Sequence, residues 1–196
     1  MCQLFETIRV AGGEPQNLPL HQERMNRSRR LLFGKYDQIV LSDLIKVPDD
    51  SKSGIYRCRI IYSDSVSSIE FLPYAPANVK TLKTVDAGTL SYDFKYLDRR
   101  HLTSLIDKNA ADDLLILRNG CITDASFANI VFTEGSRWVT PDTPLLRGTM
   151  RELLLRKKMI TEGRLTVEEI NRFTHFRLIN AMLGFDAPIL PVSNIF

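Results

Sequence analysis

Two arginines in the first half of the chain have a spacing that suits anion binding. Arg57 and Arg59 are one residue apart in the segment 55–62, whose composition is typical of a β-strand. Because side chains alternate between the faces of a strand, both guanidinium groups should project from one face and Tyr56 from the other. Two such groups on one face would suit a dicarboxylate ligand. A sheet face that simply contacts solvent would carry the same residues equally well.

A second group of arginines lies in a segment that we predict to be a helix, residues 18–33, with Gly34 placed to terminate it. The residues at helical spacing on one stripe are Leu18, His21, Met25, Ser28 and Leu32. The segment's arginines are Arg24, Arg27, Arg29 and Arg30, and the whole chain has a net charge of +3. A nucleic-acid-binding protein usually has a broader basic face or a reading module, and the sequence shows neither. We therefore expect no nucleic-acid partner, and mild positive charge also suits an enzyme for small anionic substrates.

Several other chemistries find no support in the sequence. There is no phosphate loop, dinucleotide fingerprint, HExxH zinc motif, nucleophile elbow or calcium loop. The three cysteines, Cys2, Cys58 and Cys121, are widely spaced and indicate neither a disulfide framework nor a zinc site. Nothing local connects any of the three histidines with a nucleophile, so a serine hydrolase is not indicated either. We expect no metal site.

The compartment can be inferred from two features. The longest apolar runs, such as 114–117 and 130–132, are far too short to span a bilayer. The amino terminus lacks the basic stretch and apolar run of a secretory signal. We expect a soluble, cytoplasmic protein with no membrane association.

The chain has 196 residues, enough for one compact unit or two small lobes. Segments 55–62 and 69–72 are predicted to form a strand pair. Pro73 and Pro76 then interrupt regular structure, so we place a lobe boundary there, with a small α/β lobe at 1–74 and a larger lobe at 77–196.

The second half contains many turn and cap signals. We expect a strand at 79–85, and Asp98 is placed to cap a helix that reaches about Lys108. Asn119-Gly120 is a hairpin turn after a strand at 114–117. Further expected elements are a hairpin of 130–132 with 138–140, a helix from Gly148 to Lys158, a short helix capped by Thr166 and Glu169, and strands at 176–179 and 189–192. The pattern is that of a mixed α+β protein rather than a regular parallel sheet.

Five segments then follow one another from residue 5 to residue 182. They are FETIR at 5–9 with Gly12-Gly13, HQER at 21–24, FKYLDR at 94–99, GCITDASFANIVF at 120–132, and TP at 140–141 with PLLRGTMR at 144–151 and INAM at 179–182. Together, in this order and spacing, they resemble the class IV aminotransferase and aminodeoxychorismate lyase family of pyridoxal 5'-phosphate (PLP) enzymes. The fourth and fifth segments make a chance agreement improbable.

The resemblance implies a role for single residues. Lys95 resembles the lysine that forms the Schiff base with PLP, although a lysine without this context would be a surface residue. Arg24 resembles the arginine that binds the cofactor phosphate, with Arg27 as a close competitor. Asp124 stands where most of the family has a glutamate beside the pyridine nitrogen, which keeps this nitrogen protonated. Because aspartate is one methylene shorter, the cofactor would sit closer or a water would bridge the two.

Further residues are implied on the phosphate and substrate sides. Thr149 and Met150 offer backbone amides at a helix start, where the helix dipole favours an anion. Asn180 and Ala181 resemble a second phosphate-side turn. Strands at the position of Arg57 and Arg59 help to bind substrate carboxylates in the family.

The resemblance also implies the fold and the reaction. The fold would be PLP fold type IV, with a barrel-like antiparallel sheet in the larger lobe, the cofactor between the lobes and a homodimer that completes the site. The first choice of reaction is the lyase that converts 4-amino-4-deoxychorismate to 4-aminobenzoate and pyruvate for folate synthesis. The alternatives are an aminotransferase acting on a small amino substrate, either a branched-chain or a D-amino acid, and a non-catalytic member that acts as a binding partner.

Overall fold

The structure is a computed structural model that describes residues 2–106 and 110–196, and the chain divides into two compact units. The first unit contains the residues up to Pro76 together with Phe94–Asp98, and the second contains Ala77–Asp93 and Arg99–Phe196. The short segment Phe94–Asp98 belongs to the first unit because its backbone pairs with the start of the chain. The Leu97 N–H donates to the Gln3 carbonyl at 2.9 Å, and the Phe5 N–H donates to the Lys95 carbonyl at 3.0 Å. Lys95 therefore lies in the first unit, although its position in the sequence predicted the larger lobe at 77–196.

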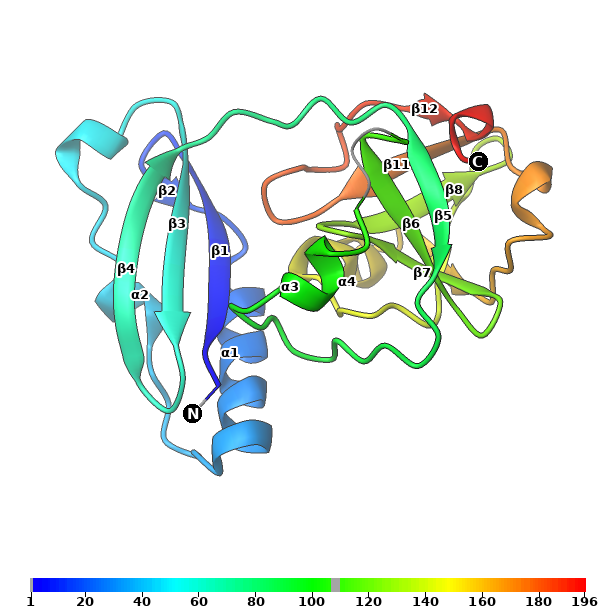
Figure 1. Cartoon of the computed structure of the whole chain (residues 1–196). Helices are drawn as coiled ribbons and strands as arrows, with labels where there is room; N and C mark the ends of the chain where they lie inside the picture. Colours follow the sequence, from blue (N-terminus) through cyan, green and yellow to red (C-terminus); the bar gives the residue numbers. More distant parts are fainter. Residues whose placement is uncertain (1, 107–109) are drawn as a thin grey trace. The chain divides into compact units, whose positions relative to one another are not determined.

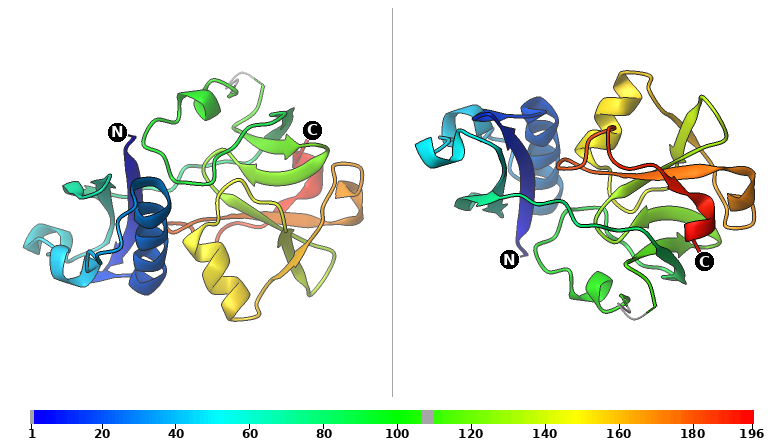
Figure 2. Two further views of the ribbon diagram at one scale, coloured as in Figure 1. Left: turned by 90° about the horizontal axis from the view of Figure 1, so that it is seen from below. Right: turned by 90° about the horizontal axis from the view of Figure 1, so that it is seen from above.

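The first unit is an antiparallel sheet with a helix on one face (Figure 1). The strand order is β2-β1-β3-β4, with β1 at Leu4–Ala11, β2 at Glu14–Pro15, β3 at Ile55–Tyr62 and β4 at Val66–Pro73. Helix α1, Leu18–Phe33, runs along this sheet in both views of Figure 2. Its Met25 packs into a core with Leu4, Ile8 and Ile60 from the strands. The short helices α2, Leu41–Leu44, and η1, Asp49–Ser51, follow α1 in the chain.

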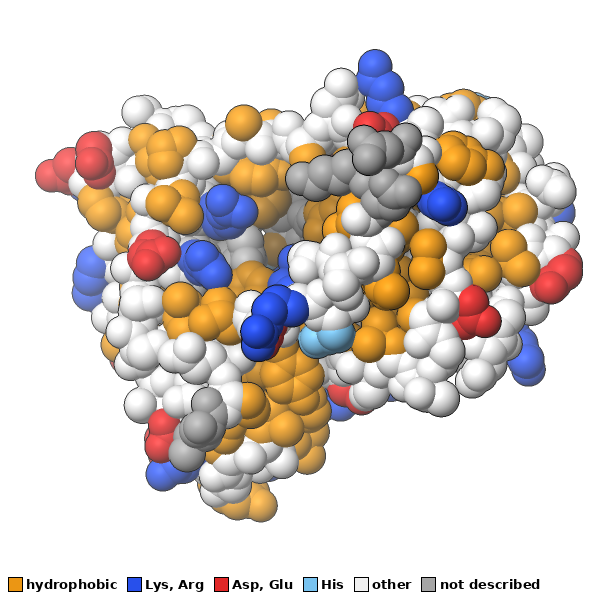
Figure 3. All heavy atoms as spheres, in the orientation of Figure 1, with side chains coloured by type: hydrophobic (Ala, Val, Ile, Leu, Met, Phe, Trp, Pro, Cys, Tyr) orange, Lys and Arg blue, Asp and Glu red, His pale blue; other side chains and the backbone are white. Residues whose placement is uncertain are grey.

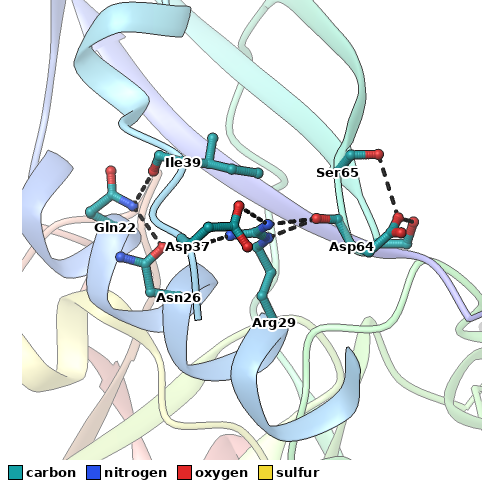
Figure 4. Close-up of polar contacts among 8 residues, drawn as sticks. Gln22, Asn26, Arg29, Asp37, Ile39, Asp64 and Ser65 are labelled. Atoms are coloured by element: carbon teal, nitrogen blue, oxygen red, sulfur yellow. Dashed lines mark hydrogen bonds and ion pairs between the residues drawn. The ribbon is translucent and has the colours of Figure 1, made fainter. Parts of the chain in front are cut away.

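The helix predicted at 18–33 is confirmed at both ends. Gly34 adopts a left-handed conformation, φ 65°, and its N–H donates to the Arg30 carbonyl at 3.2 Å, which ends the helix. The buried Arg29 ties the last turns of α1 to two neighbouring loops (Figure 4). Its guanidinium group donates to the Asp37 carboxylate at 2.9 Å and to the Asp64 carbonyl at 2.6 Å.

The second unit contains two sheets around one core. A five-stranded sheet has the order β10-β9-β8-β11-β12, and a three-stranded sheet has the order β5-β6-β7. The strands are β5 at Leu82–Asp86, β6 at Asp113–Arg118, β7 at Cys121–Ala125, β8 at Asn129–Thr133, β9 at Trp138–Pro141, β10 at Thr161–Gly163, β11 at His175–Ile179 and β12 at Leu190–Pro191. Leu115 and Ile122 from one sheet share a hydrophobic cluster with Ile130 and Phe176 from the other.

The expected barrel is not what the second unit shows. Its sheets are open within the described residues, and they pack through side chains instead of closing through hydrogen bonds. Not all pairs are antiparallel, since β5 pairs with β6 and β9 with β10 in parallel. The predicted hairpin turn at Asn119-Gly120 is confirmed, with φ 52° and 72° at its two residues.

The helices of the second unit are shorter than the sequence predicted. Helix α3 is Arg100–Thr103, and it has no side-chain cap, so the prediction that Asp98 caps a long helix is wrong. After Thr103 the chain forms turns in which Leu105 and Ile106 donate to carbonyls three residues earlier, and the predicted end at Lys108 lies outside the described residues. Helix α4 is Thr149–Arg156, ending before a left-handed Lys158. The remaining 3-10 helices are η2, Ile170–Arg172, and η3, Val192–Asn194.

The surface in the view of Figure 3 carries basic and acidic side chains scattered among hydrophobic and uncharged ones. No helix of the described chain is long and apolar enough to cross a membrane.

Candidate active site

Lys95 lies beside the first strand of the first unit. Its neighbour Tyr96 forms an isolated bridge with Leu4, which fixes the backbone of this segment along the edge of β1. The Lys95 side chain is half-buried, and its Nζ lies 4.6 Å from the centre of the Phe5 ring. A cation over an aromatic face is stabilised by the negative charge density of the ring. Lys83, an alternative lysine, is exposed on β5.

The substrate-side arginines predicted from the sequence lie on the same strand face as Phe5. Arg59 contacts the Phe5 ring at 5.5 Å, so one aromatic ring is in contact with both Lys95 and Arg59. In the register of β1 and β3, Arg57 stands directly opposite Arg9. The Nε atom of Arg57 is buried and has no hydrogen-bond partner among the described residues. Two positive side chains directly opposite each other give this face of the sheet a charge that suits a bound anion.

Arg24 is held by a buried carboxylate. Glu6 accepts hydrogen bonds from Arg24 Nε at 2.9 Å and Arg24 Nη2 at 2.5 Å. The same carboxylate accepts from His21 Nδ1 at 2.6 Å. The side chains of Glu6 and His21 are fully buried, whereas that of Arg24 is 12% exposed. The competing Arg27, three residues further along the helix, is exposed.

The pKa shifts of Glu6 and His21 indicate which of the two side chains is charged at neutral pH. Burial alone would raise the pKa of Glu6, but the charge of Arg24 and the hydrogen bonds from His21 and Arg24 outweigh it and hold the pKa at about 2. Burial, and less strongly the charges of Arg24 and Lys95, lowers the pKa of His21, although Glu6 opposes this shift. At neutral pH Glu6 is therefore ionised, and a neutral His21 donates its Nδ1–H to it.

The second unit also contains a buried carboxylate, that of Asp124. Its Oδ1 accepts from Asn129 Nδ2 at 2.7 Å, and its Oδ2 accepts from the Leu146 N–H at 2.9 Å. Burial raises the pKa of Asp124 to about 6, against the opposing effect of these hydrogen bonds and of the Arg151 charge. Arg151 itself pairs with Glu162 at 2.6 Å. Asp124 is thus a buried acid whose hydrogen bonds come from neutral amide groups.

The segment that contacts Asp124 continues into the start of α4. Gly148 precedes the helix, and a Cβ atom at this position would lie 2.0 Å from Asn129 Oδ1. Asn129 also donates to the Leu146 carbonyl at 2.8 Å, so one side chain contacts both Asp124 and the turn. Thr149 is buried at the first helical position, and no side chain caps the first turn. Thr149 and Met150 are therefore placed at an amide-rich helix start, as the sequence predicted.

The Asn180 side chain holds its own turn. Its Oδ1 accepts from the Met182 and Leu183 N–H groups, both at 2.8 Å, and its Nδ2 donates to the Phe127 carbonyl at 3.3 Å. These contacts fix the shape of the turn. If this turn binds an anion, we expect the backbone of Ala181 to do so rather than the Asn180 amide.

Within the first unit, the structure brings Lys95 close to Phe5, Arg59 and the Glu6 cluster, and within the second it brings Asp124 to the turn before α4. Sequence reasoning missed four contributors: Glu6, Arg9, Asn129 and Gly148. Glu6 left a signal, because its neighbours two residues away in the strand, Leu4 and Ile8, are apolar and buried. A charged residue in such an alternating pattern must find a partner inside the protein.

Comparison with known proteins gives a consistent result. Residues 3–195 match the family model described as amino-transferase class IV. An uncharacterized protein of Haemophilus influenzae is 38% identical over 187 residues, which cover 94% of this chain and 100% of that protein. A crystal structure named "putative 4-amino-4-deoxychorismate lyase" from Haemophilus somnus has 33% identity and a TM-score of 0.88, covering 94% of this chain and 98% of the other.

A more distant structure shares the fold. It is named a hypothetical aminotransferase from Mycobacterium tuberculosis in its PLP-bound form, with 19% identity and a TM-score of 0.77. The match covers 96% of this chain and 80% of that one.

Proposed function

Because the chain belongs to the class IV aminotransferase family, we propose that it is a PLP-dependent enzyme in which Lys95 carries the cofactor. The observation that carries this proposal is the state of Asp124. A buried carboxylate with only neutral donors is costly unless a cation meets it. The protonated pyridine nitrogen of PLP is such a cation, and its N–H would give the carboxylate a charged hydrogen-bond donor.

The other residues suit the remaining parts of PLP. Arg24 would bind the phosphate through its guanidinium group, and the start of α4 at Thr149 and Met150 would add backbone donors. The backbone at Ala181 would add a further donor. When bound, PLP supplies an aldehyde for imine exchange with an amino substrate and a ring that accepts electrons.

The protein's own groups would then perform three tasks. Lys95 Nζ would hold PLP and, once released by the substrate's amino group, would accept a proton from the substrate carbon that carries this amino group. Its contact with Phe5 keeps the amine on the sheet face that carries the arginines. Asp124 holds the proton on the ring nitrogen, and its burial excludes water from this contact.

Within this family of reactions, we propose the lyase that converts 4-amino-4-deoxychorismate to 4-aminobenzoate and pyruvate, a step of folate synthesis. This substrate has two carboxylates, and Arg57 and Arg59 lie on the face that Phe5 shares with Lys95. The likeness to the Haemophilus somnus structure, at 33% identity, supports the same choice. We further propose that the enzyme acts as a cytoplasmic homodimer.

The reaction test separates the lyase from its main alternative, an aminotransferase for branched-chain or D-amino acids. Purified protein loaded with PLP is supplied with aminodeoxychorismate alone, and 4-aminobenzoate and pyruvate are measured. The lyase should release both in equal amounts without a keto acid. If leucine or D-alanine instead reacts rapidly and 2-oxoglutarate restores the cofactor, while aminodeoxychorismate gives no pyruvate, the enzyme is an aminotransferase. A non-catalytic member would do neither.

A further inference from the structure

The first unit contains a buried carboxylate that the proposed reaction does not use. Glu6 lies on the face of β1 that packs against α1, where its neighbours along the strand are Leu4, Ile8 and Val10, all fully buried. An ionised group at such a position is costly unless its hydrogen bonds and charge are fully matched. The role of Glu6 therefore depends on the groups that it contacts, Arg24 and His21.

Most of the hydrogen bonds to Glu6 come from Arg24. Both carboxylate oxygens accept from Arg24, through the Nε–Nη2 edge of the guanidinium group. A bidentate contact of this kind fixes the plane of the guanidinium as well as its distance. The remaining contact, from His21 Nδ1 at 2.6 Å, holds the carboxylate from a second direction. Because His21 is neutral, it adds orientation to Glu6 and no competing charge.

The side chains of Glu6, His21 and Arg24 differ in their exposure to solvent. Glu6 and His21 are fully buried, and Arg24 alone reaches the surface, at 12% exposure. An anion in solution can therefore contact Arg24 but not the groups behind it. The arrangement is that of a presented guanidinium supported from inside the protein.

We propose that Glu6 is a positioning residue that, with His21, holds the Arg24 guanidinium in the orientation in which it binds the phosphate of PLP. This inference rests on the proposed function. Arginine loses considerable rotamer freedom when it binds an anion, and a side chain that is already fixed loses less. Glu6 would thus increase phosphate affinity although it has the same sign of charge as the phosphate.

The two effects of Glu6 predict opposite results for its neutral variant. If the charge of Glu6 dominated, Glu6→Gln would remove a negative charge that opposes phosphate binding at Arg24, and PLP would bind more tightly. If orientation dominates, as we propose, the variant loses the bidentate contact and PLP binds more weakly. The direction in which Glu6→Gln changes the affinity for PLP therefore distinguishes the two effects.

The experiment compares PLP with pyridoxal, which has the same ring and aldehyde but no phosphate. Dissociation constants of both are measured by absorbance titration for the wild-type protein, Glu6→Gln and Asp37→Asn. Asp37→Asn is the matched control, since Asp37 pairs with the buried Arg29 of the same helix and takes no part in the site (Figure 4). We expect Glu6→Gln to weaken PLP binding about tenfold, by analogy with the loss of a charge-assisted contact. Pyridoxal binding should stay within about twofold, and Asp37→Asn should change neither.

Equal weakening of PLP and pyridoxal would show a general structural role for Glu6 and overturn the inference, as would unchanged or tighter PLP binding. If Glu6→Gln does not fold, as judged by circular dichroism, His21→Leu and His21→Asn replace it. Leucine removes the donor to Glu6, whereas an asparagine amide can substitute for Nδ1, so only the leucine variant should weaken PLP binding. A wild-type protein that binds no PLP would refute the proposed function itself. Loss of PLP in Arg24→Ala but not in Glu6→Gln would refute only this inference.

Discussion

The amide of Asn129 donates to the carboxylate of Asp124 at 2.7 Å inside the second unit, where both side chains are buried. The same amide reaches the Leu146 carbonyl at 2.8 Å, so Asn129 connects the proposed pyridine partner with the turn that leads into α4. Asp124 thus depends for its orientation on a residue that contacts no cofactor atom in our proposal.

Asn129→Ala should therefore impair catalysis more than cofactor binding. The variant loses the side-chain donor to Asp124, and the carboxylate gains freedom to turn away from the ring nitrogen. We expect turnover to fall about tenfold or more while PLP still attaches to Lys95. Steady-state kinetics and an absorbance spectrum of the same preparation measure both. Normal turnover in this variant would show that Asp124 keeps its orientation without Asn129.

Gly148→Ala should destabilise the protein through a single steric contact. The backbone at Gly148, φ −71° and ψ 146°, suits alanine, but its Cβ would lie 2.0 Å from Asn129 Oδ1. We expect a loss of about 1–3 kcal/mol in the free energy of unfolding, as for other overpacked sites. Urea unfolding of a double-mutant cycle provides the control, because Asn129→Ala removes the colliding atom. If the two changes are simply additive, the clash is not the cause.

Asp124 should make the stability of the cofactor-free protein depend on pH. Its pKa is about 6 in the folded protein and 3.8 for the isolated group, so the folded state holds this proton more tightly. The contribution of Asp124 is therefore fully present below about pH 4 and is lost as the pH rises through about 6. A shift of about two units corresponds to roughly 3 kcal/mol.

The measurement is the difference in unfolding free energy between wild type and Asp124→Asn at pH 4 and pH 7. Glu6 acts in the opposite direction, because its lowered pKa of about 2 makes its contribution fade as the pH falls. It is present in both proteins and cancels in the difference. Wild type should lose stability relative to the variant as the pH rises. A difference that is independent of pH would mean that Asp124 titrates normally.

The arginines of the first unit should affect substrate binding without affecting the cofactor. Arg59→Ala and Arg57→Ala are each expected to raise the KM for a dicarboxylate substrate by about tenfold or more, the effect of losing one charge-assisted contact. The dissociation constant of PLP should be unchanged. The exposed Arg27 is the matched control, and Arg27→Ala should leave KM as it is. An unchanged KM in both β3 variants would assign these arginines to a solvated sheet face.

Local sequence signals predicted local structure well. The stripe from Leu18 to Leu32 and the left-handed Gly34 gave α1 its exact bounds, and Asn119-Gly120 gave the hairpin between β6 and β7. The predicted helix from Asp98 failed, since a capping residue cannot substitute for the packing that extends a helix beyond its first turn. The barrel-like sheet expected for the second unit was not found for a similar reason. Whether sheets close into a barrel depends on how they pack against each other rather than on the sequence of any single strand.

In the candidate site too, the sequence predicted single residues but not the tertiary contacts that position them. Lys95, Arg24 and Asp124 followed from a resemblance of short segments, whereas the partners that hold them did not. The Lys95 segment owes its position to two hydrogen bonds, one between Lys95 and Phe5 and one between Leu97 and Gln3, and no local pattern encodes a pairing between residues so far apart in the chain. Asn129 and Gly148 likewise meet only in the folded protein. Glu6 is the exception, as a lone charge in an apolar alternation already signals a buried partner.

The assignment of Lys95 is the central claim, and it can be tested with one preparation. Protein incubated with PLP is reduced with borohydride, digested, and analysed by mass spectrometry to locate the covalently fixed cofactor. We predict a single modified residue, Lys95, and no modification in Lys95→Ala. A cofactor fixed on Lys83 or Lys108, or no fixed cofactor at all, would contradict the account.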